Sequence, residues 1–311
     1  MTFFLCAAVT LLIFLNGATD ASNAIAAAVA SGALRMRQAA ILSAVGNVAG
    51  GVLSGMLFSR VGQSVADTAQ FGGFGTAGVL ASLSATVIFT AAAWLFRLPT
   101  SESHALLSAM AGASAALGGG NILSSLLPVA VWMTLCVAGG FFMGLLLPLF
   151  FKGGGRAASV RRSQIFSAAL SSFFHGAQDL PKFLTLLFAS GCAGNRAAVW
   201  PAAALVMGLG TLAGGRRMTE AVGSDLAHLT GHAALSSDFA AAGTLCLFSI
   251  AGVPASTTHA KTAAVAGAAL VSPGCRLHAA QLCLFLLAWV LTFPLAAALG
   301  YFCMRLFLAF L

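Results

Sequence analysis

The sequence has few charged residues, and acidic ones are the scarcest. Of its 311 residues, 15 are Lys or Arg and 7 are Asp or Glu, so that 7% are charged. Soluble domains carry about 25%, and so few charges cannot cover the surface of a water-soluble globule. A disordered chain is also excluded, because such chains are polar and highly charged. At 59% hydrophobic, the composition leaves a polytopic all-α membrane protein, with room for roughly eight to ten passes of about 20 apolar residues.

Cysteine and basic residues form no cluster that points to another class of protein. The 7 cysteines are odd in number, stand singly and form no CxxC pair, which excludes a disulfide scaffold and a zinc site. The formal charge is +8, but the basic residues lie in short loops between apolar runs, where they specify membrane topology. We therefore expect no nucleic-acid partner and no cofactor.

The apolar runs fall into two sets with the same order. The first set lies at about residues 2–34, 38–58, 76–96, 104–120 and 123–151, and the second at about 164–191, 197–213, 235–251, 259–272 and 279–310. The first run of each set is interrupted by polar residues, at 16–20 and near 175–181. The predicted organisation is a first repeat over 1–151, a basic cytoplasmic linker over 152–163 and a second repeat over 164–311.

Two polar motifs repeat in the same order. Residues 16–23 read NGATDASN and residues 175–182 read HGAQDLPK; further on, 98–104 read LPTSESH and 253–259 read VPASTTH. Asp20 and His104 are 84 residues apart, and Asp179 and His259 are 80 apart. A duplication accounts for two motifs that recur in order at nearly equal separation.

The basic residues predict the orientation of the repeats. If the central loop is cytoplasmic, nine basic residues lie inside and three outside. The inside set is Arg35, Arg37, Lys152, Arg156, Arg161, Arg162, Arg216, Arg217 and Arg276, and the outside set is Arg60, Arg196 and Arg305. Both termini are then outside the plasma membrane, and the repeats have inverted topology, a plan typical of secondary transporters. The two runs on either side of each Pro-containing motif either cross the membrane or form re-entrant hairpins; as hairpins, they enter from opposite sides and their tips can meet.

The carboxylates in apolar runs are the first functional candidates. An ionised residue inside a membrane span costs about 2.5–3.5 kcal/mol on insertion scales. Asp20 and Asp179 occupy equivalent places, in sequences where we expect each helix to break. A broken helix offers carbonyl oxygens to a cation and N–H groups to an anion. The alternative is that each Asp only caps a helix.

The tips supply hydroxyl groups. Ser101, Ser103, Ser256, Thr257 and Thr258 suit a tetrahedral oxyanion, or they cap the helices that follow.

Lys182 adds a positive charge that can serve the anion or pair with Asp179 one helical turn away. His104 and His259 are packing residues or proton carriers.

These motifs resemble those of the inorganic phosphate transporter (PiT) family, over nearly the whole chain. That family carries Gly-x-Asn-Asp-x-x-Asn in its first half and His-Gly-x-Asn-Asp-x-Gln-Lys in its second. Gly17, Asp20 and Asn23 match the first signature, and the second is matched by His175, Gly176, Asp179 and Lys182. The tips from Pro99 to His104 and from Pro254 to His259 also look like family elements.

The resemblance implies cation-coupled phosphate uptake. It places the anion at the substrate-binding residues Asn23, Ser101, Ser103, Lys182, Ser256, Thr257 and Thr258. It places the coupling cation, Na⁺ or H⁺, at Asp20 and Asp179, and we add Thr19, Gln178 and Glu102 as candidate ligands beside them. A homodimer is compatible with the analogy.

Several residues depart from the family pattern. Thr19 and Gln178 stand where the family has Asn, Pro181 stands where it has Gln, and Lys261 adds a positive charge after the second tip. Glu102 puts a carboxyl among hydroxyls; we expect it to be protonated, to pair with Arg97 or Lys182, or to ligate the cation. Sulfate therefore stays open as a substrate, although an acceptor carboxyl favours phosphate, which carries a proton to donate.

Two other functions compete with a phosphate or sulfate transporter. A cation exchanger also brings acidic residues together in inverted repeats, but it has no use for the fixed ammonium of Lys182. An intramembrane aspartyl protease needs two carboxyl groups that share a proton, and the Tyr-Asp and Gly-x-Gly-Asp contexts of those enzymes are absent. The sequence thus favours a transporter, not an enzyme.

Overall fold

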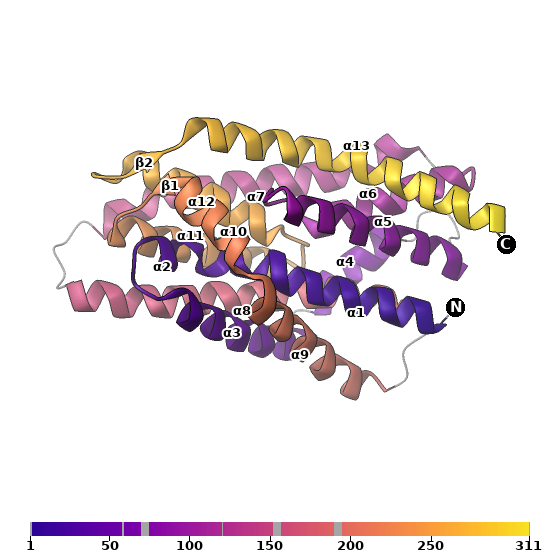
Figure 1. Cartoon of the computed structure of the whole chain (residues 1–311), viewed down its shortest axis with the longest axis horizontal. Coiled ribbons are helices and arrows are strands. Elements are labelled where there is room, and N and C mark those ends of the chain that lie inside the picture. The colour runs from indigo at the N-terminus through magenta and orange to yellow at the C-terminus, as the bar shows by residue number, and fades with distance from the viewer. Residues whose placement is uncertain are drawn as a thin grey trace.

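The protein is described by a computed structural model, which covers residues 2–57, 59–69, 75–119, 121–151, 157–189 and 195–310. The helices run roughly along the long axis (Figure 1). Seven of the described helices are long and apolar enough to cross a membrane, which confirms a polytopic membrane protein. This number is below the expected eight to ten because two helices are short and α8, although long, carries many polar residues.

The long helices follow the same order in both repeats, whereas the short elements between them differ. The first contains α1 (Thr2–Thr19), the 3₁₀ turn η1 (Ala21–Ile25), α2 (Ala26–Ala30), α3 (Met36–Leu57), α4 (Ser59–Ala69), α5 (Gly75–Leu95), α6 (Glu102–Ala116) and α7 (Ile122–Phe150). The second contains α8 (Ala157–Ala189), α9 (Arg196–Gly214), α10 (Arg216–Glu220), the π-helical turn η2 (Ala221–Asp225), β1 (Ala227–His228), α11 (Gly231–Ala251), α12 (Thr257–Val271), β2 (Arg276–Leu277) and α13 (Ala279–Phe310). Strands β1 and β2 pair antiparallel, with Ala227 opposite Leu277.

Only one of the two expected helix breaks is present. The first is confirmed: α1 ends at Thr19, and the chain passes through Asp20 into η1. The second is wrong, because α8 is continuous through Asp179 even though it contains Pro181. A proline removes one backbone hydrogen bond and strains the turn before it. Here α3 and α11 pack against α8, and this packing holds the helix together.

The predicted linker over 152–163 is described only in part. Residues 152–156, which include Lys152 and Arg156, lie outside the described residues. Residues 157–163 form the first turns of α8. The exact boundary between the repeats stays a prediction.

The two motifs with proline form hairpin tips, as expected. We call α5–α6 the first hairpin with the first tip (residues 97–104), and α11–α12 the second hairpin with the second tip (252–259). Helices α6 and α12 have 15 residues each, about 22 Å at 1.5 Å per residue, too short for a hydrocarbon core of about 30 Å. The hairpins are therefore re-entrant.

The hairpins enter from opposite ends of the molecule. Figure 1 shows both termini at one end, which we call the terminus end, and α8 beginning at the other, which we call the central-loop end. The first hairpin extends from the terminus end and the second from the central-loop end, beside β1 and β2. The rings of His104 and His259 stack with 5.1 Å between centroids, so the two tips meet inside the protein.

Glycines allow close helix crossings at equivalent places in the two repeats. A methyl group on Gly17 of α1 would lie 2.0 Å from the carbonyl oxygen of Met207 in α9, and one on Gly176 of α8 would lie 2.2 Å from that of Asn47 in α3. Small residues let helix backbones approach in a membrane. The glycines of both signature motifs thus serve helix packing.

The last helix of each repeat packs against the hairpin of the other repeat. Helix α13 lies against α6, and α7 lies against α12. The indole N–H of Trp289 in α13 donates to the carbonyl of Pro99 in the first tip at 2.8 Å. The thiol of Cys136 in α7 donates to the carbonyl of Ser256 in the second tip at 3.3 Å.

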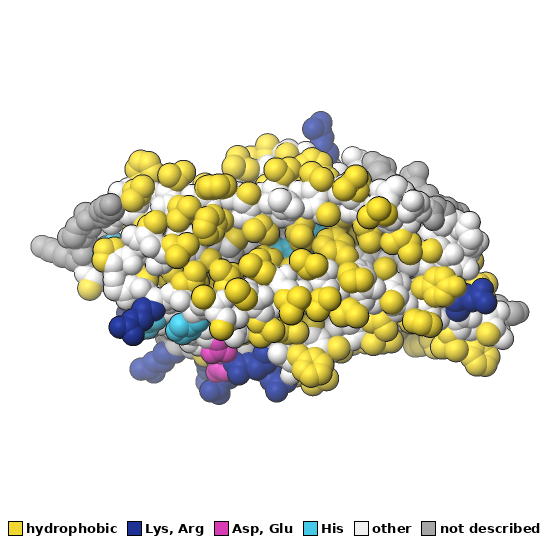
Figure 2. Space-filling model, turned by 90° about the horizontal axis from the view of Figure 1, so that it is seen from above, with side chains coloured by type: hydrophobic (Ala, Val, Ile, Leu, Met, Phe, Trp, Pro, Cys, Tyr) yellow, Lys and Arg dark blue, Asp and Glu magenta, His cyan; other side chains and the backbone are white. Residues whose placement is uncertain are grey.

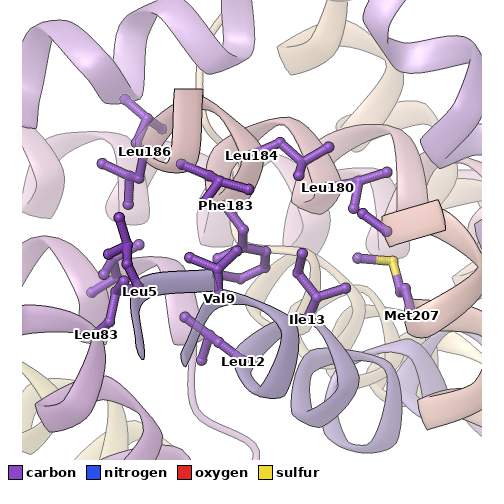
Figure 3. Packing of buried hydrophobic residues seen from close by; sticks show 14 of the residues in the cluster. Leu5, Val9, Leu12, Ile13, Leu83, Leu180, Phe183, Leu184, Leu186 and Met207 are labelled. Atoms are coloured by element: carbon purple, nitrogen blue, oxygen red, sulfur yellow. The ribbon is translucent and has the colours of Figure 1, made fainter. Parts of the chain in front are cut away.

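An apolar core surrounds the polar interior. Figure 3 shows side chains of α1 facing those of α8, with Leu83 of the first hairpin and Met207 of α9 beside them. Burying each such side chain contributes about 1.5–3 kcal/mol in water, and in a bilayer the same residues provide close van der Waals packing. Figure 2 shows one face largely covered with hydrophobic side chains, as lipid contact requires, with most of its charged side chains gathered along one edge.

Candidate functional site

Asp20 lies at the break between α1 and η1, close to both tips. Its position between α1 and η1 is 5% exposed. The Thr258 side chain of the second tip and the backbone N–H of Glu102 in the first tip lie close enough to this carboxyl to influence its charge. Asp20 therefore lies beside both hairpins, which a helix cap alone would not require.

Asp179 is buried on α8 and has partners from three elements. Its Oδ1 accepts a hydrogen bond from Lys182 Nζ at 2.7 Å. Its Oδ2 accepts one from Asn16 Nδ2 at 3.1 Å and one from Thr257 Oγ1 at 3.3 Å. The Nε2 atom of His175 lies 3.2 Å from the same oxygen. The expected ion pair with Lys182 is confirmed.

Lys182 and Gln178 hold the backbone of the second tip. The fully buried Lys182 ammonium also donates to the carbonyl of Ala255. Gln178 Nε2 donates to Ser249 Oγ at 2.8 Å, and Gln178 Oε1 accepts from the backbone N–H of Ala255 at 3.2 Å. These contacts give both residues a positioning role; their roles toward the anion and the cation stay predictions.

Glu102 begins α6 and faces α1. Its Oε1 contacts the hydroxyl of Thr19, and its Oε2 has no hydrogen-bond partner among the described residues. The expected pairing with Arg97 or Lys182 is wrong. Arg97 instead pairs with Asp225, at 3.0 Å. The Lys182 ammonium is hydrogen-bonded to Asp179. A protonated Glu102 and a cation ligand remain the two expectations.

Two of the tip hydroxyls have the capping role that the sequence allowed, and the oxyanion role of the tips stays a prediction. Ser101 accepts a hydrogen bond from the backbone N–H of His104 at 3.4 Å, and Ser256 accepts one from that of His259 at 3.3 Å. These two serines cap α6 and α12. The other N–H groups at the start of each helix have no partner within the helix.

The remaining predicted residues lie at the same place. Asn23 Nδ2 donates to Thr258 Oγ1 at 2.9 Å, which joins η1 to the second tip. Ser103 lines a cavity of about 70 Å³ with Ser64 of α4 and Pro254 of the second tip. All twelve residues predicted from the sequence thus lie on α1–η1, α8 and the two tips.

The site has more acceptors than donors. The carboxyls of Asp20, Glu102 and Asp179 face a single ammonium, that of Lys182. Two amide oxygens, Asn16 Oδ1 and Asn23 Oδ1, have no partner among the described residues. Buried polar atoms without a partner are rare, and oxygen ligands of this kind suit a hard cation. Across the described part of the chain, no cluster of His, Cys, Asp and Glu fits a transition metal.

Sequence reasoning missed several polar partners. Asn16 begins the first motif, where His175 begins the second, and Asn47 Oδ1 lies 2.7 Å from His175 Nδ1. Asp238 of α11 forms an ion pair with Lys261 of α12, and both are buried. Asp238 stands in the apolar run 235–251, so the rule that singled out Asp20 would have found it too.

Known proteins with similar sequences are transporters. The model of the phosphate transporter family (PHO4) matches the chain twice, at residues 16–158 and 153–300, in agreement with two repeats. A probable low-affinity inorganic phosphate transporter of Rhizobium meliloti is 32% identical over 93% of this chain and 91% of its own length. One of the same description from Bacillus subtilis is 29% identical over 92% and 91%.

A solved structure shares the fold. Described as the sodium-dependent phosphate transporter, it superposes with a TM-score of 0.79, covers 100% of this chain and 99% of its own, and is 20% identical in sequence. Inverted repeats, two meeting hairpins and the double family match lead to one assignment: the chain belongs to the phosphate transporter family.

Proposed function

We propose that the protein imports inorganic phosphate together with Na⁺ or H⁺ by alternating access. The observation that carries this proposal is the charge of the site: three buried carboxyls and one ammonium lie where hairpins from opposite ends meet. An anion cannot enter an excess of negative charge in a medium of low dielectric constant. It enters only when a cation or protons enter with it, which is the basis of coupling.

The anion binds between the tips. The N-termini of α6 and α12 both point into this region, and helix N-termini attract oxyanions through free N–H groups and the helix dipole. Hydroxyls of Ser103, Thr257 and Thr258 supply further donors. Lys182 contributes its charge while it stays bound to Asp179.

The cation binds on the side of Asp20. The carboxyls of Asp20 and Glu102, the hydroxyl of Thr19 and the unpartnered oxygen of Asn23 form an oxygen-rich set. Asp179 is part of the same network through Asn16. The sodium dependence of the solved relative supports Na⁺, and the carboxyl of Glu102 supports H⁺.

Phosphate fits this site better than sulfate. Monohydrogen phosphate has an O–H that can donate to a carboxyl or amide oxygen, whereas sulfate at neutral pH has only acceptors. An unpaired buried acceptor costs about 1–3 kcal/mol. Acceptors of the site that the cation leaves unpaired therefore favour the protonated anion.

Uptake of labelled phosphate into proteoliposomes tests the function. We expect uptake to depend on an inward Na⁺ or proton gradient and to be inhibited weakly by sulfate. Asp20→Asn and Asp179→Asn should each abolish uptake, while size-exclusion profiles show that the variants remain folded. Absence of phosphate uptake by the wild type would contradict the proposal. Stronger inhibition by sulfate would favour a sulfate permease, and peptide cleavage would favour the protease.

We propose the membrane orientation from charge alone. Most basic residues lie at the central-loop end, so that end faces the cytoplasm and both termini face outside. Accessibility of a terminal tag to a protease added to intact cells tests this orientation. Sedimentation of the detergent-solubilised protein tests whether it forms a homodimer.

A further inference from the structure

The base of the first tip is bound to a segment of the other repeat by charged contacts. Arg97 Nη2 lies 3.0 Å from Asp225 Oδ2 and 3.5 Å from Glu220 Oε2. One turn earlier, the guanidinium of Arg217 lies over the ring of Trp94, at 5.1 Å from its centroid. We call these five residues the latch.

The latch requires an unusual backbone at Arg97. Its φ angle is +57°, in the left-handed region that glycine occupies without strain and that other residues rarely adopt. The shift of 155 residues that takes Pro99 to Pro254 takes Arg97 to Gly252, where φ is +72°. The second tip thus has glycine at this turn, and the first tip has a strained arginine. We attribute the arginine at this strained position to the ion pairs that its side chain forms with Glu220 and Asp225.

The segment that Arg97 binds lies over the site. Helix α10 and η2 follow α9 at the central-loop end, and Thr219 Oγ1 of α10 donates to the carbonyl of Ser22 in η1 at 3.2 Å. Ser22 is flanked by Ala21 and Asn23, next to the proposed cation ligands. Figure 2 shows acidic side chains together with several Lys and Arg side chains along one edge of the face. Arg97, Glu220 and Asp225 are each about two-fifths exposed, whereas Asp20, Glu102 and Asp179 are buried.

The second tip has an uncharged counterpart of the latch. Ser64 Oγ of α4 donates to the carbonyl of Gly252 at 2.7 Å. The cavity lined by Ser64 and Ser103 lies next to this contact, because Val253 and Pro254 also line it. The second tip thus has a cavity beside its neutral contact, whereas the first tip is held by ion pairs.

We propose that Arg97, bound to Glu220 and Asp225, is the gate that closes the central-loop side of the site. This inference rests on the proposed transport function. Release of the anion on that side requires the first tip to move away from α10–η2, and the ion pairs break in that step. Because they are exposed, they break at a small cost, which suits a contact that opens in every cycle.

A reversible cross-link tests the gate directly. The double variant R97C/D225C, reconstituted in proteoliposomes, is cross-linked with a bifunctional thiosulfonate that spans the length of the replaced Arg side chain, because two cysteines alone would be too far apart for a disulfide. It should lose at least about tenfold of its phosphate uptake on cross-linking and regain it on reduction. The variant H228C/R276C is the matched control: it joins β1 to β2 at the same end and should keep its uptake when cross-linked. Wild type with the same reagent reports on the native thiols. Uptake by the cross-linked R97C/D225C protein at the reduced rate would overturn the proposal.

A second test does not depend on transport. R97G copies the second tip, relieves the left-handed strain and removes the ion pairs, so it should fold well. We expect amide hydrogens of residues 97–104 to exchange about threefold to tenfold faster than in wild type, whereas R97K should lie between the two. Equal exchange in R97G and wild type would refute the latch. If the wild type takes up no phosphate, the proposed function fails, and the exchange experiment still decides whether Arg97 holds the tip.

Discussion

The two hairpins have the same backbone and different chemistry. The shift of 155 residues that superposes the tips pairs Glu102 with Thr257, and it pairs Leu83 and Leu106 with Asp238 and Lys261. In both hairpins a serine caps the second helix, α6 or α12. Each tip then ends in a histidine, and the two histidine rings stack. The duplication thus preserved the crossings and caps that shape the site, while the charges became unequal.

The unequal charges divide the work between the hairpins. The first hairpin brings an unpaired carboxyl to the site and rests on apolar neighbours. The second brings only hydroxyls to the site and contains an ion pair behind them, where Ser167 Oγ of α8 also donates to Asp238 Oδ2 at 3.4 Å. We infer that cation binding depends more on the first hairpin and anion binding more on the second. The following experiments test this difference.

The largest effect is expected at the ion pair of the second hairpin. Asp238→Asn leaves the Lys261 ammonium buried without a counter-charge, and breaking a buried pair in this way costs about 3–5 kcal/mol. The double variant D238L/K261L copies Leu83 and Leu106 of the first hairpin and should recover most of that loss. Thermal unfolding in detergent measures both. A double variant less stable than Asp238→Asn would show that the two hairpins cannot exchange their interiors.

Exchanging the tip residues should separate cation from anion dependence. Glu102→Thr copies the second tip and removes one cation ligand, which is worth about 1.5–3 kcal/mol; the cation concentration for half-maximal uptake should rise about tenfold or more. Thr257→Glu should abolish uptake, since it adds a carboxyl beside Asp179. Phosphate uptake measured against Na⁺ concentration and pH gives both results. Unchanged cation dependence in Glu102→Thr would remove Glu102 from the coupling site.

The helix crossings should respond equally in both repeats. Gly17→Ala and Gly176→Ala each press a methyl group against a carbonyl oxygen, and overpacking of this kind costs about 1–3 kcal/mol. Gly231→Ala is the control, because its nearest neighbour would be a Val160 methyl at 3.6 Å. Unfolding temperatures of the three variants test the expectation. A large difference between the first two would mean that the crossings are not equivalent.

The smallest effect is expected where the hairpins touch. The ring stack of His104 and His259 should contribute about 0.5–1.5 kcal/mol. A double-mutant cycle with His104→Ala and His259→Ala measures this coupling as a difference in stability. Additive effects would show that the tips meet without interacting.

The sequence predicted the repeats and the composition of the site well, because both depend on local rules. Polar residues inside apolar runs indicate an interior site. The nearly equal separation of the two polar motifs in each half identifies Asp20 and Asp179 as equivalent positions. The continuity of α8 was not predictable, since it depends on neighbours that pack around Pro181. The partners of Glu102 and Arg97 also depended on the tertiary fold: only the structure shows that Arg97 turns away from the site toward Asp225.

The exchange of last helices has a consequence for biosynthesis. The first tip is fixed by Trp289, which is translated 190 residues after the Pro99 carbonyl it binds. While the ribosome is still producing the second half, the first hairpin lacks this anchor and its neighbour α13. The two halves thus complete their folding together, and a nascent, unfinished chain cannot contain the complete transport site.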